Sequence, residues 1–127
     1  MRRLSNLYSE RMKMFKVTKK ILNNTLQRMI DVYELEGYGW CRRALARTAS
    51  SKQCDLKDPN VACVCASGAM HVVFNRQHRS SHESILIAQE IQNLFHQKLG
   101  RGVVSYNDYS AKSKRALIKT LRSMIVE

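Results

Sequence analysis

The sequence has few acidic residues, little proline and no long apolar run, and each shortage excludes a class of protein. Only 10 of the 127 residues are acidic, and the chain has one proline and five glycines. The longest apolar stretches, such as residues 69–74 and 85–88, stop well short of the roughly 20 residues that a membrane-spanning helix needs. Hydrophobic residues make up 44%, which excludes fibrous and wholly disordered chains. Polar residues follow the first basic ones, so we expect no signal peptide.

The shortage of acidic residues leaves a large positive charge. Lysine and arginine total 22, so the formal net charge is +12 at pH 7. The excess lies mainly at the two ends of the chain and around residues 42–47. Clustered positive charge attracts polyanions through Coulomb attraction and counterion release, so nucleic acid is the expected partner. An acidic protein surface would use the same charges, and a solvated surface that only aids solubility is a third interpretation.

We expect phosphate contacts from basic residues in three parts of the chain. Such contacts position a nucleic acid without reading its sequence. No helix-turn-helix or zinc-finger spacing indicates a protein that reads bases. The expected contact residues are Arg2, Arg3, Lys13, Lys16, Lys19, Lys20, Arg42, Arg43, Lys112, Arg115 and Lys119.

The cysteines favour a reducing compartment and no metal. Because no export signal is visible, reduced thiols in a cytoplasm fit the four cysteines better than disulfides do. Cys63 and Cys65, followed by His78 and His82, offer a zinc alternative. A single spacer on a helix turns two thiols about 200° apart, so we expect neither a metal nor another cofactor.

Catalytic groups do not assemble in the sequence. Cys65 and His71 are the nearest Cys–His pair, but six residues along one helix is the wrong spacing for contact. Gly37-x-Gly39 and Gly100-x-Gly102 lack the strand and full spacing of a phosphate-binding loop. Because no nucleophile, base and orienting group come together, we expect a protein that is not an enzyme.

Helical periodicity dominates the chain, and the expected fold is mainly α. Thr18 can cap the first expected helix, Ser80 and Glu83 have the spacing of a capping box, and Gly37 and Gly100 stand where helices end. Valines after residue 60 keep a strand alternative open there. The prediction is a compact bundle of four to five helices over residues 18–127, with a basic amphipathic extension over 1–17. The expected helices span 18–36, 41–48 and 81–99, with one beginning at Asp58-Pro59 and one capped by Ser110.

Tyr106-Asn107-Asp108-Tyr109 is the most unusual polar segment. In one interpretation its aromatic rings stack on a base or nucleotide. In the other, the two tyrosines pack while Asn107 and Asp108 turn the chain and cap the last helix. The second interpretation is favoured.

Four short motifs occur in an order typical of one family. They are Gly39-Trp40, Ala46-Arg47, the segment 62–69 (Ala-Cys-Val-Cys-Ala-Ser-Gly-Ala) and Ser105-Tyr106-Asn107-Asp108. Residues 18–126 therefore resemble an uncharacterised small domain family of actinobacterial and phage proteins. Its members show Gly-Trp, Ala-Arg-Asp, Cys-x-x-Gly-Ala and Trp-Asn-Asp. This chain differs at Thr48, in place of Asp, and at Tyr106, in place of Trp.

The resemblance implies a helical fold, a bacterial or phage source and no established activity. It also implies a shared cluster in which Arg47 and Asp108 form an ion pair; the members are Trp40, Arg47, Cys65, Gly68, Asn107 and Asp108. A candidate nucleotide pocket consists of Trp40, Arg47, Tyr106, Asn107 and Asp108.

These observations converge on one expected function and two alternatives. The expectation is a small basic phage-type or bacterial accessory protein of the cytoplasm, or of the host cytoplasm if phage-encoded. It binds nucleic acid or a nucleoprotein complex through its Lys/Arg surface. The alternatives are a non-enzymatic inhibitor or regulator that binds a host protein, and a protein with a nucleotide-binding pocket. No membrane association is expected.

Overall fold

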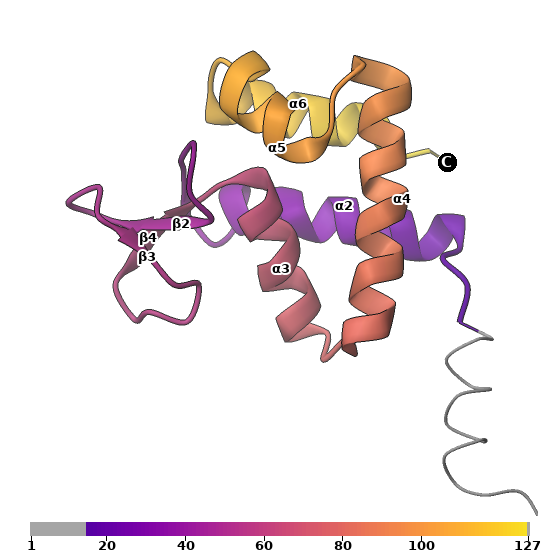
Figure 1. Cartoon of the computed structure of the whole chain (residues 1–127), viewed down its shortest axis with the longest axis horizontal. Helices are drawn as coiled ribbons and strands as arrows, with labels where there is room; N and C mark the ends of the chain where they lie inside the picture. Colours follow the sequence, from indigo (N-terminus) through magenta and orange to yellow (C-terminus); the bar gives the residue numbers. More distant parts are fainter. Residues whose placement is uncertain (1–14, 127) are drawn as a thin grey trace, which may run out of the picture.

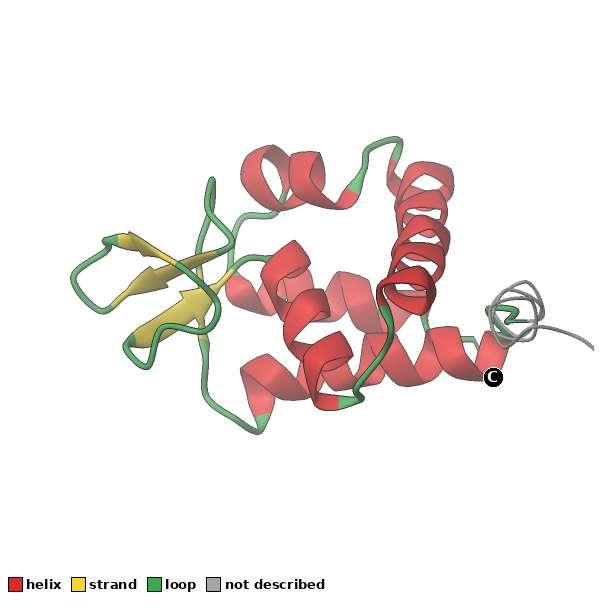
Figure 2. Ribbon diagram, turned by 60° about the horizontal axis from the view of Figure 1, so that its bottom comes forward, coloured by secondary structure: helices red, strands yellow, loops and turns green. Residues whose placement is uncertain are grey.

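The computed structural model describes residues 15–126, and these form a mainly helical fold that also contains a sheet (Figures 1 and 2). Most of the predicted extension over 1–17, including Arg2, Arg3 and Lys13, lies outside the described residues. In chain order the elements are α2 (Lys19–Glu34), β1 (Gly39–Trp40), β2 (Ala46–Thr48), β3 (Gln53–Cys54), β4 (Val61–Val64), α3 (Ala66–Arg76), α4 (Ser81–Leu99), α5 (Val103–Ser105), the π-helical turn η1 (Tyr106–Ser110) and α6 (Lys114–Met124).

Two of the expected helices, α2 and α4, have the caps that the sequence predicts. The Thr18 hydroxyl accepts a hydrogen bond from the Ile21 amide at 3.2 Å and starts α2. Ser80 and Glu83 form a complete capping box at the start of α4. Gly100 ends α4 in the left-handed conformation, with φ 69°, which a residue without Cβ adopts most easily.

A four-stranded sheet contradicts the predicted all-helical bundle and replaces the expected helix over 41–48. The strand order is β1-β4-β2-β3, in which β1 is parallel to β4 and the other pairs are antiparallel. Ala46, fully buried, faces Val64 on one side and Cys54 on the other. These partners lie elsewhere in the chain, so the helix-like spacing of 41–48 gave no sign of them.

The helix expected from Asp58-Pro59 is also wrong at its start. The Asp58 carboxylate accepts from the Asn60 amide at 2.8 Å, and the Val61 amide bonds the Asp58 carbonyl, so this segment is a turn. The alternative of a strand after residue 60 is confirmed by β4, and the helix α3 begins only after Cys65. Asp before Pro is equally typical of a turn, and the β-branched Val61 and Val64 favour the strand.

The last helix begins three residues later than predicted. Ser113, not Ser110, caps α6 by accepting from the Ala116 amide at 3.0 Å. Ser110 instead ends η1, where the Ala111 amide reaches the Tyr106 carbonyl at 2.8 Å in an i to i+5 bond.

The core lies around α2, which packs against α3, α4 and α6. Figures 1 and 2 show the sheet at one end of this helical assembly, beside the end of α2 that leads into β1. η1 and the start of α6 lie over the same end, and α6 runs from there toward the start of α2, where the Val126 amide donates to the Asn23 side chain. No helix among the described residues is long and apolar enough to cross a membrane. The largest fully buried side chains include Tyr33, Phe95, Leu26, Met29, Ile30, Ile87, Ile91, Leu117, Leu121 and Met124.

Candidate nucleic-acid interface

Asn107 is the centre of a buried polar cluster that joins the sheet, α3 and η1. Its side chain is fully buried. The amide oxygen accepts from the Trp40 indole at 2.6 Å and from the Ala66 backbone amide at 2.9 Å. The amide nitrogen donates to the Cys41 carbonyl at 3.0 Å and to the Asp108 carboxylate at 2.9 Å. All four hydrogen-bonding positions of the amide are therefore used, and we call these five residues the Asn107 cluster.

Asp108 extends this cluster to the loop between β1 and β2. Its Oδ1 accepts from the backbone amide of Arg43 at 2.9 Å. Arg43 has φ 61°, in the left-handed region that a long side chain seldom adopts. A conformation of this kind persists only where the surroundings hold it, and the Asp108 contact does so here. The Arg43 guanidinium lies 5.8 Å from the centre of the Tyr109 ring.

The Cys-x-x-Gly motif forms the start of α3 beneath the cluster. Cys65 is the N-cap, and its sulfur accepts from the Gly68 amide at 3.3 Å. Its own amide bonds the Leu45 carbonyl at 3.1 Å. A Cβ on Gly68 would lie 2.3 Å from that carbonyl oxygen, so only glycine lets α3 approach this closely.

The residues of the candidate nucleotide pocket are only partly brought together. Trp40 and Asp108 join Asn107, but Tyr106 is buried against Phe95 and its hydroxyl pairs with Thr120 at 2.6 Å. The Arg47 guanidinium donates to the carbonyls of Ser51 and Arg42. The structure describes both Arg47 and Asp108, and no ion pair joins them. The predicted Arg47–Asp108 ion pair is therefore wrong.

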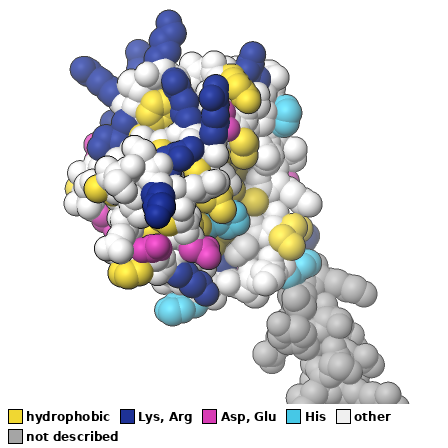
Figure 3. Space-filling model, turned by 60° about the vertical axis from the view of Figure 1, so that its left-hand side comes forward, with side chains coloured by type: hydrophobic (Ala, Val, Ile, Leu, Met, Phe, Trp, Pro, Cys, Tyr) yellow, Lys and Arg dark blue, Asp and Glu magenta, His cyan; other side chains and the backbone are white. Residues whose placement is uncertain are grey.

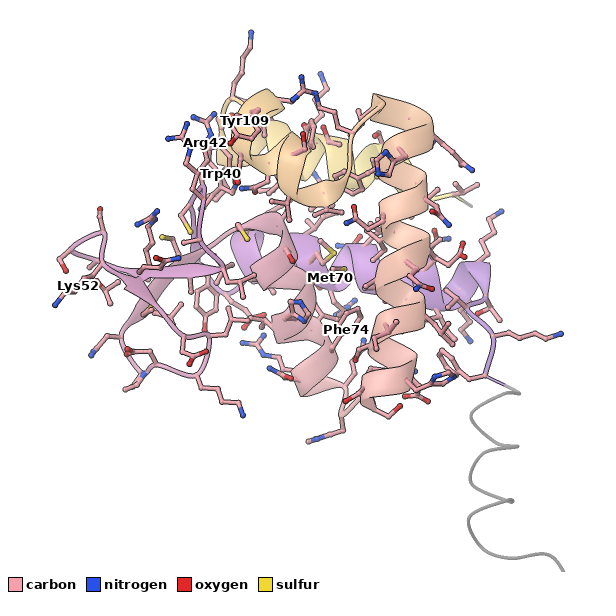
Figure 4. The ribbon with its side chains drawn as sticks, in the orientation of Figure 1. Trp40, Arg42, Lys52, Met70, Phe74 and Tyr109 are labelled. Carbon is pink, nitrogen blue, oxygen red and sulfur yellow. The ribbon has the colours of Figure 1, made fainter. Side chains whose placement is uncertain are left out.

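The predicted basic residues of the β1–β2 loop and of α6 are brought to one end of the molecule. The Arg42 guanidinium lies 4.8 Å from the centre of the Trp40 ring and donates to the Ala111 carbonyl, directly before Lys112. Figure 4 shows Trp40, Arg42 and Tyr109 together at this corner. Figure 3, in which the sheet end comes forward, shows lysine and arginine side chains gathered over its upper part, where α5 and α6 lie. We call the following set the basic face: Arg42, Arg43, Lys112, Lys114, Arg115, Lys119 and Arg122.

A groove between α6 and the end of α2 continues this face. It has a volume of about 920 Å³ and is lined mainly by basic residues of α6, with Ile118 between them. Lys114 donates to the Tyr38 carbonyl at 3.3 Å, and Arg122 pairs with Glu34. α6 carries four basic residues and no acidic one. Positive charge therefore follows the helix along its exposed side.

The other predicted cations lie at the opposite end of α2. Lys16, Lys19 and Lys20 are exposed and stand at the start of that helix. Sixteen residues of α-helix span about 24 Å, which separates them from the residues that follow its far end. The predicted phosphate-contact residues that the structure describes therefore form two separate groups.

The cysteine and histidine pairs of the zinc alternative do not meet. Cys63 and Cys65 precede α3, whereas His78 and His82 follow it, and 11 helical residues span about 16 Å. Within residues 15–126 no three His, Cys, Asp or Glu side chains are placed to hold a metal ion. Burial raises the pKa of the Cys65 thiol, because the charged form is desolvated more than the Gly68 amide compensates.

The favoured prediction for the Tyr-Asn-Asp-Tyr segment is confirmed for Tyr106, which is buried, but is wrong for Tyr109, which is exposed, and for the helix cap, which is Ser113. Tyr109 is one of three exposed apolar residues beside the basic face. Tyr109 is 69% exposed, and Val104 and Leu45 are 53% and 46% exposed. A groove of about 490 Å³ includes all three in its lining, together with Arg43 and Asp108. The motif around Asn107 drew attention to Tyr109, but no signal in the sequence distinguishes it from the buried Tyr106.

The comparisons with known proteins concern the same part of the chain as this site. A model of a family of unknown function (DUF6197) matches residues 20–127. No curated protein and no solved structure matches. The match includes the sheet, the Cys-x-x-Gly motif, the Asn107 cluster and α6. The chain therefore belongs to the family of unknown function DUF6197.

Proposed function

We propose that this protein binds nucleic acid, with the basic face holding the phosphates. The observation that carries the proposal is the contact between Arg42 and the Ala111 carbonyl, because it joins the cations of the β1–β2 loop to those of α6. Two basic segments far apart in the sequence thereby form one surface. A surface of this kind favours a polyanion over a single small anion.

The exposed cations of this face are available to a ligand. Lys112, Arg115 and Lys119 are exposed, and no ion pair within residues 15–126 involves them. Arg115 and Lys119 are four residues apart on α6, so they lie on the same side of the helix. Each phosphate that such a cation neutralises releases counterions, and the binding constant then falls as salt rises.

The proposal includes a cellular setting. We place the protein in a bacterial cytoplasm, or in the host cytoplasm if a phage encodes it, as an accessory protein of a nucleic acid or nucleoprotein complex. Its motifs resemble those of actinobacterial and phage proteins. Its free cysteines, two of them buried, suit a reducing compartment.

Fluorescence anisotropy tests the proposal directly. Labelled single-stranded DNA, duplex DNA and structured RNA of equal length are titrated with the protein at two salt concentrations. We expect binding that weakens steeply with salt. The triple variant Lys112→Gln/Arg115→Gln/Lys119→Gln should lower the slope of log K against log salt by about 2 to 3, because each lost phosphate contact removes about 0.7 to 0.9.

A matched variant separates the basic face from net charge alone. Lys52→Gln/Lys57→Gln/Lys98→Gln removes the same charge at exposed positions that do not belong to the basic face. It should leave the salt slope nearly unchanged. Equal effects of the two triple variants would contradict the assignment to this face, and no binding at low salt would contradict nucleic-acid binding altogether. A single nuclease-resistant acidic protein that co-purifies, with no binding to any oligonucleotide, would instead favour the regulator alternative.

A further inference from the structure

The groove lined by Leu45, Val104 and Tyr109 is mainly apolar, whereas the basic face beside it is positively charged. Leu45, Val104 and Tyr109 are large exposed apolar side chains that come from the β1–β2 loop, α5 and η1 and share one groove. Exposed apolar side chains that gather in this way mark a binding surface more often than scattered ones do. Arg43 and Asp108 add one cation and one carboxylate to the same lining.

The Tyr109 ring is held where a flat ligand can reach it. It is 69% exposed, and the Arg43 guanidinium lies 5.8 Å from its centre. The Arg43 backbone amide donates to Asp108, the residue before Tyr109. Tyrosine rings and arginine planes are the surfaces on which unpaired bases stack. Because Arg43 belongs to the basic face and lies 5.8 Å from the Tyr109 ring centre, the ring borders that face.

We propose that the nucleic acid is single-stranded and that one unpaired base stacks on Tyr109 in this groove while neighbouring phosphates lie on Arg42, Arg43 and Lys112. The inference rests on the proposed function and names its substrate class. In a duplex the bases are already paired and stacked, so their faces are closed to a tyrosine ring. The apolar walls suit a base and not a phosphate.

Asp108 supports a base in the groove over a phosphate. Its carboxylate repels a phosphate but accepts hydrogen bonds from the N–H groups on the Watson–Crick edge of an unpaired base, such as the N3–H of thymine. Oδ1 already accepts from Arg43 and Asn107, which fixes the orientation of the carboxylate. The groove thus combines a stacking ring and an acceptor within a cationic border.

An abasic strand separates base contacts from phosphate contacts. We would compare three probes of equal length by anisotropy: an oligothymidylate, an abasic strand with the same phosphates, and a duplex. Tyr109→Ala should weaken oligothymidylate binding roughly fivefold or more, the effect of losing one base–aromatic stack, and leave abasic binding unchanged. Tyr109→Phe should restore binding. Ile85→Ala, which removes another exposed apolar side chain away from the groove, should have no effect.

The outcomes distinguish this inference from the proposed function. Tighter binding to the duplex than to the single strand, or an equal loss on the abasic strand for Tyr109→Ala, would overturn the inference and leave nucleic-acid binding in place. No binding of any probe would overturn both. A change in the fluorescence of Trp40, the only tryptophan, on adding oligothymidylate but not on adding the abasic strand would support a base at this corner.

Discussion

The Asn107 cluster and the basic face lie next to each other, and their polar groups are satisfied in opposite ways. In the cluster every hydrogen-bonding position of the Asn107 amide is used inside the protein. On the basic face Lys112, Arg115 and Lys119 project into solvent without an ion pair in the described part of the chain. Buried polar groups stabilise a fold only when they are fully paired, whereas exposed charges contribute little to stability and remain available to a partner.

The Tyr-Asn-Asp-Tyr segment contains both kinds of residue. Tyr106 and Asn107 face inward and hold the fold together, while Tyr109 faces outward and Asp108 connects the two. A motif of this kind therefore combines an architectural role and a surface role in consecutive residues. The predictions below test whether these roles separate in experiment.

Asn107→Ala should have the largest effect on stability. It removes four hydrogen bonds and leaves the Trp40 indole, the Ala66 amide and the Cys41 carbonyl without this partner. We expect a loss of about 3 to 5 kcal/mol in the free energy of unfolding, measured by urea denaturation. Asn93→Ala, at an exposed position of α4, should change it by less than about 0.5 kcal/mol. Similar losses for the two variants would contradict the central role of Asn107.

Gly68→Ala should have the next largest effect. Its Cβ would lie 2.3 Å from the Leu45 carbonyl oxygen, so α3 would have to move away from the loop before β2. We expect a loss of about 1 to 3 kcal/mol in urea denaturation, as for other overpacked sites. Gly102→Ala is a comparison, because its new Cβ would lie 2.9 Å from a side-chain atom, Gln92 Oε1, and not against backbone. A larger loss at Gly102 than at Gly68 would contradict the close approach.

Cys41, a member of the cluster, should make the fold sensitive to alkali. Burial first, and then the Cys63 thiol, raise the pKa of Cys41 from 9.0 to about 12. Between these values the unfolded chain loses the thiol proton and the folded protein keeps it, so stability falls as the pH rises. The melting temperature of Cys41→Ala should fall less steeply above pH 9 than that of the native chain. Parallel curves would exclude Cys41 as the source.

The smallest effect on stability should come from the basic face. Lys112→Gln/Arg115→Gln/Lys119→Gln should change the free energy of unfolding by less than about 0.5 kcal/mol per site, since exposed charges contribute little. The same variant should lose most of the salt-dependent nucleic-acid binding. A large loss of stability would show that these side chains have a structural role and would remove the contrast with Asn107.

The helix limits were the part of the fold that could be predicted best. Thr18, Ser80 and Gly100 act at α2 and α4 as the sequence indicates, because each bonds backbone groups within one turn of itself. The strands could not be predicted in the same way. β2 has three residues, and its partners in β3 and β4 are specified by the tertiary fold alone. The helix predicted to start at Asp58-Pro59 is wrong for a related reason, since this pair is equally compatible with a helix start and a turn.

The candidate site was predictable in its residue types but not in its geometry. The sequence indicated Arg42, Lys112 and Arg115 as cations, but not that Arg42 would lie beside Lys112. It drew attention to Asn107 without indicating that the side chain is fully buried and fully bonded. The expected Arg47–Asp108 ion pair does not form, because Arg47 bonds nearby carbonyl groups.

The sequence by itself determined the net charge of +12, the limits of α2 and α4 and the presence of a motif around Asn107. These properties depend on composition or on contacts within a few residues. Only the tertiary structure decided the sheet, the inward direction of Tyr106 and the outward direction of Tyr109, and the union of two basic segments into one face. These depend on packing between residues far apart in the chain, which local periodicity does not encode.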